Sequence, residues 1–109
     1  MADRLGAFEQ AVLLAVLRLG DQAYGRALLK EVETRLGRPV AAGAVHITLE
    51  RLDKKGLVTS RLGSGTPIRG GRARRFYSLQ QRGVGALNDA RAAIDDLWQG
   101  FDYPIKGTT

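Results

Sequence analysis

The chain has 109 residues, no cysteine and a formal net charge of +6. This length corresponds to one domain, and the lack of cysteine excludes disulfides and thiolate metal sites. The longest apolar run, residues 11–17, is far shorter than the ~20 residues that span a bilayer. Its charged flanks are also unlike a secretory signal, so we expect a cytoplasmic protein.

The positive charge is concentrated in the middle of the chain. Residues 54–88 contain eight basic side chains and no acidic one, whereas residues 1–53 contain seven of each sign. A basic segment of this kind indicates a polyanionic partner, although a solvated basic surface has the same composition.

Two helices are predicted in the first third of the chain. Residues 5–17 form a mostly apolar helix that ends at Gly20. Residues 24–36 form a second helix, which Gly37 ends and Pro39 prevents from continuing. The apolar stripe of the second helix recurs every four residues, at Tyr24, Leu28, Val32 and Leu36.

The third predicted helix covers residues 42–56 and has two different faces. Its inward stripe consists of Val45, Leu49 and Leu52. The opposite side carries Gly43, Ile47 and Lys54, with Glu50 and Arg51 at its edges. An isoleucine beside an arginine on an outward face is typical of a helix that is pressed into a groove.

A basic hairpin and a final helix follow. Residues 57–62 and 74–79 read as strands, joined by a long loop rich in glycine and arginine. Residues 81–101 form the last helix. Its positions Val84, Leu87, Arg91, Ile94, Trp98 and Phe101 follow a heptad spacing, broken only by the arginine.

The order of elements predicts a mainly α fold with a small β hairpin, namely a winged helix-turn-helix followed by a C-terminal dimerisation helix. We assign residues 1–80 to the winged-helix DNA-binding domain, 81–101 to the dimerisation helix and 102–109 to a flexible tail. In this arrangement the third helix enters the major groove. The hairpin tip, or wing, reaches the neighbouring backbone or the minor groove.

The candidate DNA-binding residues come from the third helix and the wing. Arg51 suits a guanine, and Ile47 and the methyl group of Thr48 suit a thymine methyl. The wing arginines suit phosphates. The full set is Ala44, His46, Ile47, Thr48, Arg51, Lys54 and Lys55 in the helix, with Arg69, Arg72 and Arg74 in the wing.

Enzymatic and metal chemistry find no support in the sequence. The glycine-rich loop lacks the Lys-Ser/Thr ending of a nucleotide-binding loop and precedes a strand instead of a helix. His46 is the only histidine and lacks partners for a metal site or for catalysis. We therefore predict a non-enzyme with no cofactor and no metal, and we interpret His46 as a residue beside the DNA that touches a phosphate.

The last helix is interpreted as the core of a homodimer, packed against its symmetry mate and the first helix. Trp98 either packs this interface or lines an opening for a small aromatic effector. The interface set is Phe8, Val12, Leu87, Ile94, Trp98 and Phe101.

Three segments resemble the PadR family of bacterial transcriptional regulators: "AYGRALLKEV", "GAVHITLERLDKKGLV", and "GGRARRFYSL" followed by "RGVGAL". Together their spacing covers roughly residues 5–100. The resemblance implies a winged helix, a C-terminal dimerisation helix and repression from a palindromic operator. It also implies that an aromatic residue on the last helix can hold a flat ligand at the dimer centre. Family members usually carry tyrosine where this chain has His46.

Two classes of function follow from these observations. The first is a dimeric, sequence-specific repressor. The second is a non-specific nucleic-acid-binding architectural protein or a protein-interaction module. The mixed outward set on the third helix favours the first, because non-specific binders favour lysine and arginine there.

Overall fold

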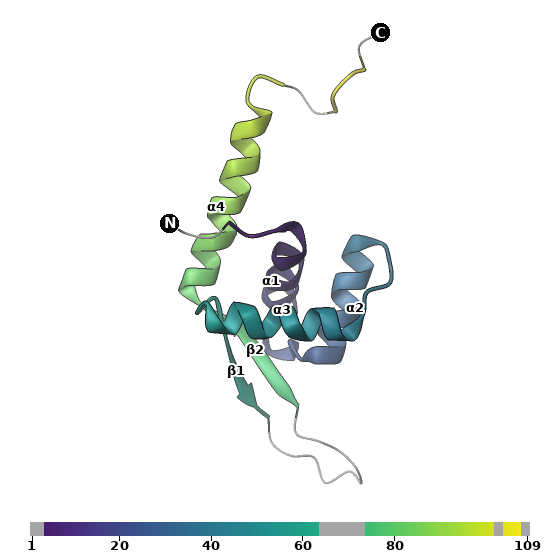
Figure 1. Ribbon diagram of the computed structural model, residues 1–109, viewed down its shortest axis with the longest axis vertical. Coiled ribbons are helices and arrows are strands. Elements are labelled where there is room, and N and C mark those ends of the chain that lie inside the picture. Colours follow the sequence, from purple (N-terminus) through teal and green to yellow (C-terminus); the bar gives the residue numbers. More distant parts are fainter. Residues whose placement is uncertain (1–3, 64–73, 102–103, 108–109) are drawn as a thin grey trace.

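The computed structural model describes residues 4–63, 74–101 and 104–107. α3 crosses α1 and α2, and the hairpin and α4 both leave this body near the end of α3 that leads into β1, where the hairpin runs downward and α4 rises upward (Figure 1). The mainly helical fold with one antiparallel hairpin confirms the predicted fold class. Within the described ranges, no helix has the length and apolar character that a membrane span requires. The elements are α1 (Ala7–Leu19), the 3-10 helix η1 (Gly20–Gln22), α2 (Gly25–Leu36), α3 (Ala42–Lys54), β1 (Val58–Leu62), β2 (Arg75–Leu79) and α4 (Gln81–Trp98).

α1 is the centre of the core. It contacts α2, α3 and β2, and its side chains Val12, Leu13 and Val16 are almost completely buried. Burial at adjacent positions means that α1 is covered on more than one side, unlike an amphipathic surface helix with a single apolar stripe. The other elements are therefore arranged around α1.

A tight turn joins α2 to α3. Gly37 adopts the left-handed conformation, with φ of 68°, which glycine reaches without steric cost. Its N–H donates to the Glu33 carbonyl at 2.8 Å, and the Glu33 carboxylate accepts the Val40 N–H at 2.9 Å. These bonds fix the entry into α3, and the two helices form the helix-turn-helix that the sequence predicts.

The inner face of α3 is the predicted one. Val45, Leu49 and Leu52 are buried, and the helix ends at Lys54, two residues earlier than the sequence indicates. Gly56 follows with a positive φ of 77°. The chain thereby turns directly from α3 into β1.

The hairpin is attached to the helical body through its second strand. β1 and β2 are antiparallel, with Ser60 opposite Tyr77. The Tyr77 N–H also donates to the Ala23 carbonyl at 2.8 Å, and Tyr24 forms an isolated bridge with Phe76. The segment between η1 and α2 therefore acts as a short third strand beside β2. Residues 64–73, including the predicted wing residues Arg69 and Arg72, lie outside the described residues.

α4 follows β2 after a single residue. That residue, Gln80, donates its N–H to the Leu57 carbonyl at 2.9 Å. Ala86, Leu87 and Ala90 in the first half of α4 pack against the core, whereas the second half extends away from it (Figure 1). The helix ends at Trp98, so Phe101 lies beyond it and not within it as predicted.

Gly83 lets the start of α4 lie directly against the hairpin. A Cβ atom at this position would overlap the carbonyl oxygen of Leu57 and come within 2.7 Å of Leu79 Cδ1. Since backbone cannot move aside cheaply, only glycine fits here.

We expect Gly83→Ala to lower the free energy of unfolding by about 1–3 kcal/mol, because it overpacks this contact. Gly85→Ala is the matched control, since no atom lies within 4 Å of its added Cβ and alanine is the better helix former. It should stabilise the protein by about 0.5–1 kcal/mol. Urea unfolding of both variants measures the difference, and equal effects would contradict the close contact.

Candidate nucleic-acid interface

The outward face of α3 is exposed and chemically mixed. Ile47 has 61% of its surface exposed, although a side chain of this size is usually buried. Arg51 follows one helical turn later. The first turns of the same face carry Gly43, Ala44 and His46, all exposed. Small and apolar groups therefore share this exposed face of α3 with the Arg51 guanidinium.

His46 is held by an acid on its own helix. Its Nε2 lies 2.6 Å from Glu50 Oε1, one helical turn away, and both side chains are more than half exposed. Among the described residues, no group of three His, Cys, Asp or Glu side chains is placed to bind a metal ion. The pair leaves His46 at the surface beside Ile47.

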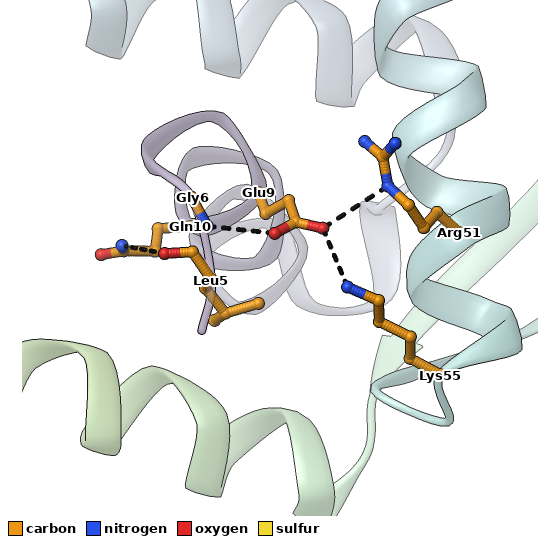
Figure 2. A network of polar contacts seen from close by, with 6 residues as sticks. All are labelled: Leu5, Gly6, Glu9, Gln10, Arg51 and Lys55. Carbon is orange, nitrogen blue, oxygen red and sulfur yellow. Dashed lines mark hydrogen bonds and ion pairs between the residues drawn. The ribbon is translucent and has the colours of Figure 1, made fainter. Parts of the chain in front are cut away.

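Glu9 of α1 joins the end of α3 through two ion pairs (Figure 2). Its Oε2 lies 3.5 Å from Arg51 Nε and 3.4 Å from Lys55 Nζ. Its Oε1 accepts the Gly6 N–H at 3.0 Å. Burial raises the pKa of Glu9, but the Gly6 hydrogen bond and the charges of Lys55 and Arg51 outweigh it, so the net pKa lies below its ordinary value of 4.5.

Aromatic rings hold two arginines at the root of the wing. The Arg74 guanidinium lies 4.3 Å from the centre of the Tyr24 ring, and that of Arg61 lies 5.0 Å from the centre of the Phe76 ring. The two rings meet edge to face, with centroids 5.7 Å apart. Such stacked cations are attracted to the ring faces and keep their N–H groups available for an anion.

The positive surface continues from α3 toward α4. Lys54 and Lys55 line a hollow of about 1090 Å³ that also has Arg4, Arg82 and Asp89 on its wall. Four cations face one carboxylate here. Three basic residues of the chain centre, Lys54, Lys55 and Arg82, thus lie together where the end of α3 meets the start of α4.

The family of the chain follows from its sequence match. The model of the transcriptional regulator PadR-like family matches residues 13–89, which covers the helix-turn-helix, the hairpin and the first half of α4. This chain belongs to the PadR-like family. It is a DNA-binding transcriptional regulator and not an enzyme.

Similar proteins agree with this membership. A transcriptional regulator of Mycobacterium tuberculosis is 34% identical over 77 residues, which are 71% of this chain and 67% of that protein. The structure of a PadR family regulator from Eggerthella lenta DSM 2243 matches at a TM-score of 0.64 and 28% identity, covering 82% of this chain and 75% of that one. The structure of RosR from H. salinarum matches at a TM-score of 0.66 and 27% identity, and the match covers 94% of this chain and 84% of that one.

The structure brings together most of the residues that the sequence nominates on α3 of this PadR-like protein. Ala44, His46, Ile47 and Arg51 share the exposed side of the helix. Thr48 does not: only 3% of its surface is exposed. It falls on the same side as Val45 and Leu52, so the prediction that it faces outward is wrong.

The predicted dimerisation set divides into core and surface residues. Val12 is fully buried within the protomer, so it has no surface to offer a second copy, and that prediction is wrong. Phe8 and Leu87 are partly buried against the same core. The exposed members are Ile94, Trp98 and Phe101.

Sequence reasoning missed two residues of this interface. The sequence places Tyr24 only in the apolar stripe of the second helix, yet its ring lies under the Arg74 guanidinium. Glu9 was not singled out. Its only local signal is its place three residues after Gly6, which favours a contact with the backbone there, and nothing local reveals its partners 42 and 46 residues further along.

The lowered pKa of Glu9 predicts an acid-sensitive contribution to stability. A depressed carboxyl pKa stabilises the fold fully above the unfolded-state pKa, and this stabilisation disappears as the pH falls through the folded-state pKa. The difference in unfolding free energy between wild type and Glu9→Gln should therefore be constant near neutral pH and shrink below about pH 4.5. Chemical denaturation across this range measures it, and a difference that stays constant down to about pH 3 would contradict the assignment.

Proposed function

We propose that this PadR-like protein is a homodimeric repressor that recognises a palindromic operator. In this proposal α3 reads base edges in the major groove and the wing contacts the sugar-phosphate backbone. Repression then requires only that the dimer occupy an operator that overlaps a promoter.

The exposed face of α3 is the observation that carries the proposal. A helix that binds DNA only through phosphates needs cations along its length. Here Ala44 and the exposed Ile47 precede Arg51 instead. An apolar side chain recognises a thymine methyl, and an arginine pairs with a guanine. This composition supports sequence-specific binding over the alternative of an architectural or protein-interaction role.

The wing supplies affinity that does not depend on base sequence. Arg61 and Arg74 lie where the wing joins the strands, stacked on the rings of Phe76 and Tyr24 respectively. We propose phosphate contacts for Arg74 and, outside the described residues, for Arg69 and Arg72. Lys54 and Lys55 at the end of α3 add to the same positive field.

Homodimerisation is proposed from the apolar surface that one protomer leaves uncovered. On α4, Leu97 has 76% of its surface exposed and Trp98 37%, and Leu14 and Leu17 of α1 are also exposed. Exposed apolar side chains along a helix that projects from the body fit a helix–helix interface. We therefore keep residues 1–80 as the DNA-binding domain and 81–101 as the dimerisation segment.

A twofold dimer accounts for a palindromic operator. It places two copies of α3 about 34 Å apart, which corresponds to one turn of DNA. Trp98 lies in the part of α4 that would approach its symmetry mate. If the two copies leave an opening there, a flat aromatic effector can stack on this ring and relieve repression.

The proposal predicts different roles for Arg51 and Arg74. A selection from random duplexes should yield a palindrome for the wild type. Arg51→Ala should cost about 1–3 kcal/mol of binding free energy on the selected site and relax the base preference at one position in each half-site.

Arg74→Ala should weaken binding to every duplex alike and flatten the log–log salt dependence of the binding constant by about one unit, since it removes one phosphate contact. A wild type that selects no sequence would favour the architectural alternative.

Trp98→Ala tests the dimer and the effector together. If Trp98 packs the interface, the variant should lose about 3–5 kcal/mol of dimer stability, which analytical ultracentrifugation detects as a shift toward monomer. If Trp98 lines an opening, the variant remains dimeric but planar ligands, which quench the wild-type tryptophan fluorescence, no longer bind. Leu62→Ala on β1, also an exposed apolar residue, is the control. A wild-type monomer that binds one half-site tightly would contradict the dimer.

A further inference from the structure

The guanidinium of Arg51 is held from one side only. Its Nε lies 3.5 Å from Glu9 Oε2, and Figure 2 shows both terminal nitrogens on the far side of the group, pointing away from the carboxylate. The side chain is about half exposed. Arg51 therefore presents two N–H-bearing nitrogens to the outside while its third nitrogen is engaged by the protein.

The Glu9 carboxylate is itself held in place by its burial and its partners. It belongs to α1, the helix around which the core is built, and only 14% of its side chain is exposed. The Gly6 N–H binds one carboxylate oxygen at 3.0 Å, and Lys55 shares the other with Arg51 at 3.4 Å. With all three partners in place, the carboxylate holds Arg51 from a rigid element outside the helix-turn-helix.

This geometry suits base recognition by arginine. Two parallel N–H groups of one guanidinium match the O6 and N7 acceptors of guanine. A free arginine must lose the freedom of a long side chain when it makes such a pair, whereas a side chain that is already held loses less. A carboxylate on the Nε side restricts the plane of the group without occupying the nitrogens that face the base.

We propose that Glu9 is a positioning residue for sequence recognition, which orients Arg51 so that its terminal nitrogens meet a guanine in each half-site. The proposal rests on the base-reading role proposed for Arg51. It differs from a simple neutralising role, in which Glu9 lowers the local positive charge and weakens binding to all DNA equally.

The test compares Glu9→Gln with a matched control, Glu31→Gln. Glu31 also pairs with two arginines, Arg18 at 3.4 Å and Arg35 at 2.8 Å, and is similarly buried at 18% exposure, but it lies on α2 away from the α3 face. Both variants remove one negative charge. Dissociation constants are measured at one salt concentration for the selected operator and for a random duplex, and their ratio gives the specificity.

Glu9→Gln should lower the specificity ratio about 3–10-fold, a part of what one arginine–guanine pair contributes, while Glu31→Gln leaves the ratio unchanged. In an Arg51→Ala background, Glu9→Gln should have no further effect on the ratio. Equal gains in affinity on both duplexes would overturn the proposal in favour of charge neutralisation, and so would a further loss of specificity in the Arg51→Ala background.

A thermal melt first confirms that each variant folds. If Glu9→Gln does not, Glu9→Asp replaces it in the same assay, because it keeps the charge but withdraws the carboxylate from Arg51. A lowered specificity ratio then supports the proposal, and an unchanged ratio overturns it. A wild type that does not discriminate the operator from random DNA would remove the proposed function itself. A wild type that discriminates, with an Arg51→Ala variant that does so equally well, would remove only the role of Glu9 and Arg51.

Discussion

The burial of α1 is the constraint on which the rest of the molecule depends. Val12, Leu13 and Val16 have almost no exposed surface, and α2, α3 and β2 all contact this helix. Because α3 places Val45, Leu49 and Leu52 in the same core, its opposite side has to face solvent. The composition of that opposite side, with Ile47 and Arg51, is therefore free to serve DNA recognition instead of packing.

The interface cations are organised by residues from other parts of the fold. Arg51 on α3 is held by Glu9 on α1, and Arg74 beside β2 lies on the ring of Tyr24 at the start of α2. Arg61 on β1 lies on Phe76 of β2. In each case a rigid element limits the motion of a long charged side chain, so less freedom would be lost in the proposed contact with a phosphate or a base.

Periodicity in the sequence was sufficient to predict the helices and their inner faces, because a stripe such as Leu28 and Val32 depends only on local geometry. Periodicity was insufficient where packing by another element of the fold decides whether a side chain is buried. Thr48 is predicted to face outward, yet the elements that pack on α3 bury it. Val12 reads as available for a partner, yet this protomer alone covers it. The contact between Glu9 and α3 joins residues more than forty positions apart, and no local pattern encodes such a pair.

The single-residue connection between β2 and α4 has a mechanical consequence. Gln80 is bonded to Leu57, and Gly83 lies directly against the same carbonyl, so α4 leaves the DNA-binding body through a stiff joint without a flexible linker. α4 is therefore expected to move with the hairpin as one rigid unit. In the proposed twofold dimer, a small change in the angle at which the two α4 helices cross would move the two bodies apart. It would change the spacing of the two α3 helices while each α3 kept its own geometry.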